Sequence, residues 1–290
     1  MPELPEVETI RRRLALVLEG QTIVSAVIGD PRLTRPFDPA LVAAELVGER
    51  FAELARRGKY LLLRLASGRT LVVHLRMTGS FRLATEPLPD DPYRRALLVL
   101  GTGVEVGYRD VRRFGTWELL EPGDEAGYVA DRLGPEPLAG TFTARRLGER
   151  LAGSRAPLKS VLLDQRRVAG AGNIYVDEAL WRSGLHPRRP AGGLNVDELD
   201  RLHRSLRAVL RRALALQGST LRDYAAPDGE AGSMQDEFRV YGRAGEPCVR
   251  CRAPIERIVV GGRGTWFCPV CQPASRSASS PERSSAANSS

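Results

Sequence analysis

The chain opens with Met1-Pro2-Glu3-Leu4-Pro5-Glu6-Val7-Glu8-Thr9, and this segment leads into a stretch with a helical period, Glu6 to Leu18. Apolar residues recur there three or four positions apart, while residues 11 to 13 are arginines on the opposite side. The pattern predicts an amphipathic helix whose apolar side packs against a core.

Short apolar runs, separated by glycine, proline and aspartate, follow from about residue 22 to residue 120. Runs of this kind predict strands joined by tight turns, and therefore a β-sandwich or barrel flanked by the first helix. The clearest runs are 22–28, 60–65, 70–75, 96–100 and 104–108.

Helical periodicity returns after the turn-rich residues 121–127 and indicates a second, α-helical domain. The last of its helices begins after Asn195, a preferred N-cap residue, and stops before Gly218. Residues 225–236 are rich in glycine, aspartate and alanine and predict a mobile loop. The expected helices span 143–151, 158–164, 173–183 and 196–217.

The composition restricts the partners of the chain. A net charge of +8 and a pI of about 9.8 favour a polyanionic partner, although a merely solvated basic surface is the alternative. No apolar run is long enough to span a bilayer, and the acidic start does not match a secretory signal, so we expect a cytoplasmic protein without a membrane partner. Among 43 lysines and arginines, only Lys59 and Lys159 are lysines, which makes both candidates for a role that needs a compact ammonium.

All four cysteines lie near the C-terminus, in two Cys-x-x-Cys pairs that sixteen residues separate. Each pair can direct two thiolates at one tetrahedral ion, and the linker has the length of a β-hairpin. Strands at 258–264 and 265–267 would place Arg263 near the hairpin tip, within reach of a phosphate; an ordinary exposed arginine is the simpler alternative. The sequence predicts one structural Zn²⁺, with no position open for water, held by Cys248, Cys251, Cys268 and Cys271.

Removal of Met1 would leave Pro2 with a free secondary amine. Such an amine can attack an electrophilic sugar carbon, and the resulting iminium ion promotes elimination because it has no N–H proton to lose. The neighbouring carboxylate of Glu3 could shuttle protons to the sugar ring and to the leaving base. Many chains begin with Met-Pro, so these residues alone do not decide the function.

Several motifs, in the right order, resemble those of the formamidopyrimidine-DNA glycosylase family. The resemblance covers nearly the whole chain, from residues 2–9 through Arg57-Gly58-Lys59-Tyr60-Leu61-Leu62 to the zinc finger. The other matching segments are His74–Gly79, Arg112–Gly115, Leu133–Leu138, Asp164-Gln165, Gly170–Tyr175 and Val240–Arg243.

The resemblance implies roles for individual residues. Pro2 would be the Schiff-base nucleophile and Glu3 the general acid. Lys59 would assist β-elimination, and Arg263 would hold the phosphate beside the lesion and serve δ-elimination. The family's trio that fills the gap left by a flipped-out base corresponds to Met77, Arg112 and Phe114, although core packing of Met77 and Phe114 is the alternative. Further DNA contacts are implied for His74, Tyr93, Arg155, Lys159, Asn173 and Tyr241.

The chain departs from the family pattern in its DNA-contacting segments. Val111 stands where proline is usual, and Arg76 stands where glycine is usual. A histidine expected before Leu97 is missing, and Tyr93 or Arg95 lies there instead. The departures bear on DNA contact and affinity and leave the four catalytic positions intact.

The fold implied by the resemblance is α+β and multidomain. It comprises an N-terminal catalytic β-sandwich domain with a flanking helix (1–127), a helix-two-turn-helix DNA-binding domain (128–240) and the zinc finger (241–272). Residues 273–290 are mostly serine, alanine and arginine, a composition that predicts a disordered tail.

The implied activity is removal of oxidised purines, 8-oxoguanine and formamidopyrimidines, from duplex DNA, with strand cleavage by β,δ-elimination. The protein would act as a monomer in the cytoplasm, at the nucleoid. An enzyme of the endonuclease VIII type, which favours oxidised pyrimidines, normally has glycine at the position of Leu4. A non-enzymatic zinc-finger protein that binds DNA would have no use for a free Pro2 amine.

Overall fold

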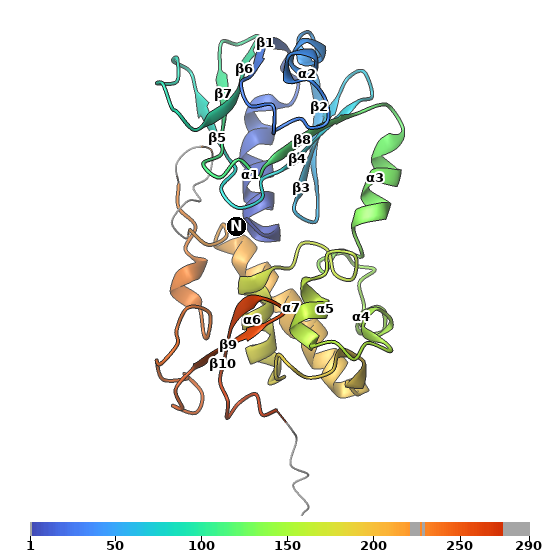
Figure 1. Cartoon of the computed structure of the whole chain (residues 1–290), viewed down its shortest axis with the longest axis vertical. Helices are drawn as coiled ribbons and strands as arrows, with labels where there is room; N and C mark the ends of the chain where they lie inside the picture. The colour runs from blue at the N-terminus through green and yellow to red at the C-terminus, as the bar shows by residue number, and fades with distance from the viewer. Residues whose placement is uncertain (1, 221–226, 228–229, 275–290) are drawn as a thin grey trace, which may run out of the picture.

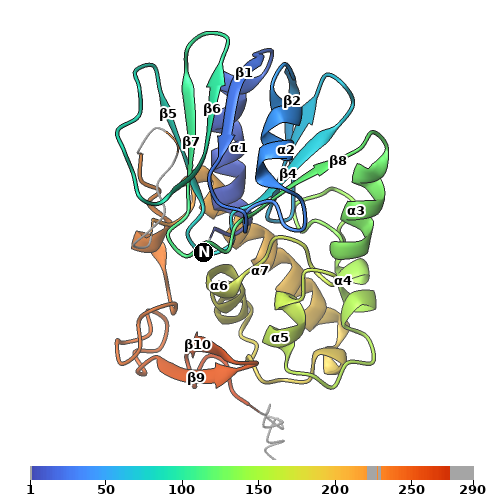
Figure 2. The same ribbon diagram turned by 45° about the horizontal axis from the view of Figure 1, so that its top comes forward.

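The computed structural model describes residues 2–220, 227 and 230–274, which form a β-rich half and a helical half (Figure 1). Helix α1 (Leu4–Leu18) runs along the β-rich half, and its N-terminal end lies at the junction of the two halves (Figures 1 and 2). The predicted amphipathic helix is confirmed, because its apolar side is fully buried: Leu4, Val7, Ile10, Leu14 and Leu18.

Two antiparallel four-stranded sheets build the β-rich half, which confirms the predicted β-sandwich with a flanking helix. Together with α1 they enclose a core that contains Phe51, Phe81, Tyr108 and Trp117. One sheet has the order β1 (Ile23–Ile28), β6 (Arg94–Leu100), β7 (Glu105–Arg109) and β5 (Ser80–Ala84); the other has the order β2 (Phe51–Arg57), β3 (Tyr60–Leu65), β4 (Thr70–His74) and β8 (Thr116–Leu120).

Two helices lie where the sequence pattern did not indicate them. Helix α2 (Pro39–Leu46) begins at Asp38, whose carboxylate accepts a hydrogen bond of 2.8 Å from the Ala40 amide. Helix α3 (Asp124–Arg132) occupies part of residues 121–127, so the expectation of turns there was wrong. Tyr128 and Val129 of α3 pack on the outer side of the second sheet, and this tertiary contact supports a helix whose local pattern is weak.

The four predicted helices of the second half are present; one has the predicted bounds, and each of the other three differs by one or two residues at one end. They are α4 (Ala144–Leu151), α5 (Leu158–Leu163), α6 (Asn173–Ser183) and α7 (Val196–Ala215), together with short 3₁₀ helices at Ala191–Gly193 and Met234–Glu237. Their core includes Phe142, Tyr175 and Leu206. Among the described residues, no helix is long and apolar enough to cross a membrane.

The cysteine-rich module contains the hairpin β9 (Glu256–Val260) and β10 (Arg263–Phe267). The turn falls at Gly261 and Gly262, both with positive φ, so the predicted strands 258–264 and 265–267 were displaced from their true positions. Arg263 is the first residue after this turn, close to the hairpin tip as predicted. Parts of the predicted loop 225–236 and most of the predicted tail 273–290 lie outside the described residues.

Candidate active site and DNA-binding surface

The start of α1 is attached to the loop that precedes α6. The Leu4 amide donates to the Gly170 carbonyl over 3.1 Å, and the Ile174 amide donates to Oε1 of Glu3 over 3.0 Å. A Cβ atom at Gly172 would lie 2.2 Å from Cδ of Glu3, so only glycine permits this approach. Pro2 and Glu3 are therefore held, both buried, at the junction of the two halves.

The second oxygen of Glu3, Oε2, is also buried and accepts no hydrogen bond from any described residue. Burial raises the pKa of the Glu3 carboxyl above its ordinary value, although nearby Lys59 acts in the opposite direction. A carboxyl group with a raised pKa and a free oxygen can retain a proton and then transfer it. These are the properties expected of a general acid beside Pro2.

Lys59 lies in the turn between β2 and β3 and is buried, with a relative exposure of 5%. Burial lowers the pKa of its ammonium group, Arg263 adds to the effect, and Glu3 opposes it. The turn is fixed by Glu136, which pairs with Arg56 over 2.9 Å and accepts a hydrogen bond from the Gly58 amide. Lys59, Glu3 and Arg263 thus form one electrostatically coupled group.

Glu6 is a member of the site that sequence reasoning did not identify. Its Oε1 accepts hydrogen bonds from the Ser219 amide (2.7 Å) and from the hydroxyl groups of Ser219 and Tyr175. Its Oε2 accepts from the Glu3 amide over 2.9 Å. The position of Glu6, three residues after Glu3 at a helix start, was the local signal that could have indicated this capping contact.

Asn173 and Lys159 attach the zinc-finger hairpin to the helical half. Asn173 Nδ2 donates to the Gly264 carbonyl over 3.0 Å. Lys159 is fully buried; its ammonium donates to the Gly264 carbonyl (3.0 Å) and to Thr265 Oγ1 (2.9 Å) and lies 2.7 Å from Oδ1 of Asp177. The structure thus turns the Lys159 ammonium toward protein groups, whereas the resemblance implied a contact with the DNA backbone.

Arg263 and Arg155 are exposed, and Tyr241 is half-buried. The Tyr241 ring lies 4.5 Å from that of Trp266, and its backbone amide donates to Glu178 over 2.9 Å. Arg155 stands just before α5. The proposed roles of all three in binding DNA remain predictions.

The proposed gap-filling residues are carried by two loops that are held together. Met77 and Phe114 are exposed by 38% and 52%, so the alternative of core packing does not apply to them. The Arg112 guanidinium lies 4.9 Å from the centre of the Phe114 ring. Asp110 joins the loops, because it accepts hydrogen bonds from the Thr78 hydroxyl and, over 2.7 Å, from the Gly115 amide.

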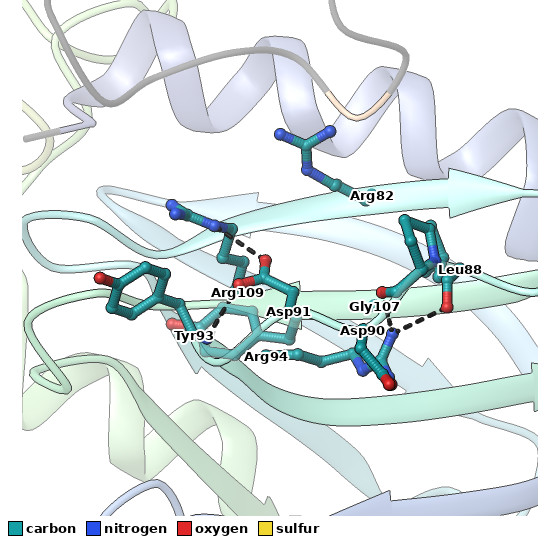
Figure 3. Close-up of a pocket in the computed structure, with 10 residues that line it drawn as sticks. Arg82, Leu88, Asp90, Asp91, Tyr93, Arg94, Gly107 and Arg109 are labelled. Carbon is teal, nitrogen blue, oxygen red and sulfur yellow. Dashed lines mark hydrogen bonds and ion pairs between the residues drawn. The ribbon is translucent and has the colours of Figure 1, made fainter.

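His74 and Tyr93 lie in different surroundings. His74 is buried, and burial lowers its pKa to about 3, so the ring is neutral; its Nδ1 accepts from the Arg76 amide over 2.9 Å. Tyr93 is 40% exposed and lines a pocket of about 360 Å³ with Asp91 and Arg109 (Figure 3). The Arg109 guanidinium lies 4.8 Å from the Tyr93 ring, which leaves an aromatic and cationic surface available at this position.

The four cysteines meet the requirements of a tetrahedral metal site. Their Sγ atoms all lie within 4.8 Å of one another, with 3.9 Å between Cys248 and Cys271 and 3.4 Å between Cys251 and Cys268. Four thiolates at about 2.3 Å from a zinc ion would be about 3.8 Å apart. The predicted set of ligands for one structural Zn²⁺ is therefore brought together and fits the ion.

Comparisons with known proteins agree with this arrangement. Three family models match in order: the formamidopyrimidine-DNA glycosylase N-terminal domain (residues 1–117), the H2TH domain of the same proteins (133–225), and a zinc finger found in FPG and IleRS (245–274). The formamidopyrimidine-DNA glycosylase of Chloroflexus aggregans is 47% identical and that of Bacillus subtilis 45% identical; each alignment covers 94% of this chain and 98% or 99% of the relative.

Solved structures give the same result. A point mutant of Lactococcus lactis FPG in complex with Fapy-dG-containing DNA has a TM-score of 0.89 and 41% identity, covering 94% of this chain and all of that one. MutM (FPG) from Thermus thermophilus has a TM-score of 0.84 and 49% identity, covering 93% and 98%. The fold of this chain therefore matches that of solved FPG proteins over nearly its whole length. The chain belongs to the formamidopyrimidine-DNA glycosylase family, as the sequence motifs predicted.

Proposed function

We propose that this protein is a bifunctional DNA glycosylase and abasic-site lyase that removes oxidised purines from duplex DNA. The observation that carries the proposal is the buried Glu3 carboxyl, with its raised pKa and one free oxygen, directly beside Pro2 and coupled to Lys59. Membership of the family supports oxidised bases as the substrate class, because relatives are seen bound to DNA that contains Fapy-dG, a damaged purine, or an oxidised pyrimidine.

In the proposed first step, the secondary amine of Pro2 forms a bond to C1′ of the damaged nucleotide as the bond to the base breaks. Glu3 supplies the proton needed for opening of the sugar ring or for the leaving base. The product is an iminium ion between Pro2 and the opened sugar, which acts as an electron sink. Loss of a proton from C2′ then expels the 3′ phosphate, and Lys59 assists this elimination.

In this scheme Arg263 holds the phosphate beside the lesion and serves the second elimination. Its hairpin is fixed by Lys159 and Asn173, so the guanidinium starts from a defined position. The zinc ion supplies no chemistry in this scheme; it would hold the loops that flank the hairpin. We propose that Met77, Arg112 and Phe114 fill the gap in the duplex and that Tyr93, Arg155 and Tyr241 contact the backbone.

We propose that the protein works at the nucleoid in the cytoplasm, because its substrate would be chromosomal DNA, and that it acts as a monomer. The proposed function is tested by single-turnover cleavage of three duplexes that contain 8-oxoguanine, a formamidopyrimidine or thymine glycol. We expect fast cleavage of the two purine lesions. A preference for thymine glycol would instead assign the chain the specificity of the endonuclease VIII type.

A further inference from the structure

A basic cavity, distinct from the pocket beside Tyr93, lies between α6, α7 and the zinc finger. Its volume is about 490 Å³, and four of its six lining residues are arginines: Arg182, Arg201, Arg204 and Arg250. The other two are Ser205 and Ala208. Arg182 stands near the C-terminal end of α6, whereas Arg250 lies between the two cysteines of the first pair.

The cavity is separate from the catalytic groups. Helix α6 begins at the catalytic end, where Ile174 contacts Glu3, and Arg182 lies at the opposite end. Helix α7 ends on the catalytic side, since Ser219 beyond it contacts Glu6, and Ser205 lies well before that end. At a rise of about 1.5 Å per residue, each helix puts the cavity roughly 12–15 Å away from the catalytic end.

The carboxylates near the cavity already have partners. Asp200 pairs with Arg204 over 2.8 Å. In the adjoining depression, Glu178 accepts hydrogen bonds from the amides of residues 239–241, and Glu237 pairs with an arginine on α7.

Three cavity arginines therefore have no acidic partner. None of the ion pairs in the described part of the chain involves Arg182, Arg201 or Arg250. Arg250 is also fixed in place, because it donates to the carbonyls of Trp181 (2.9 Å) and Arg182 (3.2 Å) and lies 3.8 Å from the centre of the Trp181 ring. The cavity thus contains three guanidinium groups without an acidic partner, and that of Arg250 is held in a fixed position.

We propose that this cavity binds backbone phosphates of a second DNA segment while the active site around Pro2 and Glu3 holds the damaged one. One guanidinium group can donate two parallel hydrogen bonds to two oxygens of a phosphate, and the Ser205 hydroxyl adds a neutral donor. An acidic peptide carries the same charge, and arginine clusters also recognise such peptides. DNA is the occupant that we propose, because solved relatives of the same family bind DNA; an acidic peptide is the alternative that the test includes. A second contact of this kind allows the protein to move between DNA segments without fully dissociating.

The test separates the two sites by filling the first. The active site is saturated with a short duplex that contains a tetrahydrofuran abasic analogue. A second, labelled, undamaged duplex is then titrated, and its binding is followed by fluorescence anisotropy. We expect the second duplex to bind with one-to-one stoichiometry. The double substitution Arg182→Gln/Arg201→Gln should weaken this second binding at least about tenfold and lower its salt dependence by about two phosphate contacts.

A matched control removes the same charge from α4, with Arg145→Gln/Arg146→Gln at two exposed positions. The proposal is overturned if the wild type binds no second duplex, or if both double variants lose the same affinity for it. It is also overturned if polyglutamate, at equal charge concentration, displaces the second duplex from the wild type. Excision from a short duplex is measured in the same variants. Unchanged excision with unchanged second-duplex binding would reject this inference and leave the proposed function standing.

Discussion

The buried pair of Lys159 and Asp177 gives a prediction with a defined magnitude. Both side chains are fully buried and lie 2.7 Å apart, and Asp177 Oδ2 also accepts the Trp266 amide over 3.1 Å. Lys159→Met keeps the length of the side chain but leaves the Asp177 carboxylate buried without its cation. Removing one partner of a buried pair costs about 3–5 kcal/mol, whereas replacing both by apolar residues is close to neutral.

We therefore expect Lys159→Met to lower the melting temperature by about 6–20 °C, and Lys159→Met/Asp177→Leu to recover most of the loss. The effect depends on pH with a definite sign. Burial raises the pKa of Asp177 to about 7 even beside Lys159, and the loss of Lys159 raises this pKa further. Relative to the wild type, the single variant should therefore lose most stability above neutral pH, and the loss should shrink as the pH falls through this further raised pKa, since the carboxyl group is protonated below it.

A second readout separates positioning from simple stability. Lys159 binds the Thr265 hydroxyl, which donates to the Arg263 carbonyl over 3.1 Å. The variant should therefore lose δ-elimination product relative to β-elimination product, as resolved on a denaturing gel. If Lys159→Met instead keeps the wild-type melting temperature and reduces the salt dependence of DNA binding by one contact, then Lys159 binds phosphate and the positioning argument is refuted.

Four further outcomes are expected. Base excision should slow as the pH rises through the raised pKa of Glu3, and Glu3→Gln should reduce excision by about 100- to 10,000-fold in single-turnover assays while DNA affinity is retained. Arg112→Ala should reduce discrimination between cytosine and adenine opposite the lesion by about 1–3 kcal/mol, measured as a ratio of excision rates. Phe114→Ala should slow excision from paired duplex but spare abasic sites, which need little unstacking. Cys268→Ser should abolish the single bound zinc in metal analysis and weaken DNA binding, because the hairpin with Arg263 loses its support.

Elements with a repeating buried face could be predicted from the sequence. Helix α1 and helices α4 to α7 were found because their apolar residues recur at helical spacing. Helix α3 was missed because part of its support is remote: Glu125 pairs over 2.7 Å with Arg64, a residue of β3. The cysteine pairs could be recognised in the same way, because the spacing within each Cys-x-x-Cys pair is a local sequence pattern that indicates metal binding.

Long-range polar contacts could not be predicted in this way. The rarity of lysine drew attention to Lys159, but it could not indicate the carbonyl partner, Gly264, which lies 105 residues further along the chain. Asp177 and Glu6 look like ordinary helix carboxylates in the sequence. Their functions depend on Lys159 and on Tyr175 and Ser219, which only the folded chain brings to them.

The central claim is that Pro2 is the nucleophile, and borohydride trapping followed by mass spectrometry tests it most directly. Protein without Met1 is mixed with a duplex that contains 8-oxoguanine, the iminium ion is reduced, and the modified peptide is sequenced. We predict a single covalent adduct on the Pro2 nitrogen, and none when Met1 or an N-terminal tag is retained. An adduct of equal yield in the tagged protein, or one located on the buried amine of Lys59, would contradict the account.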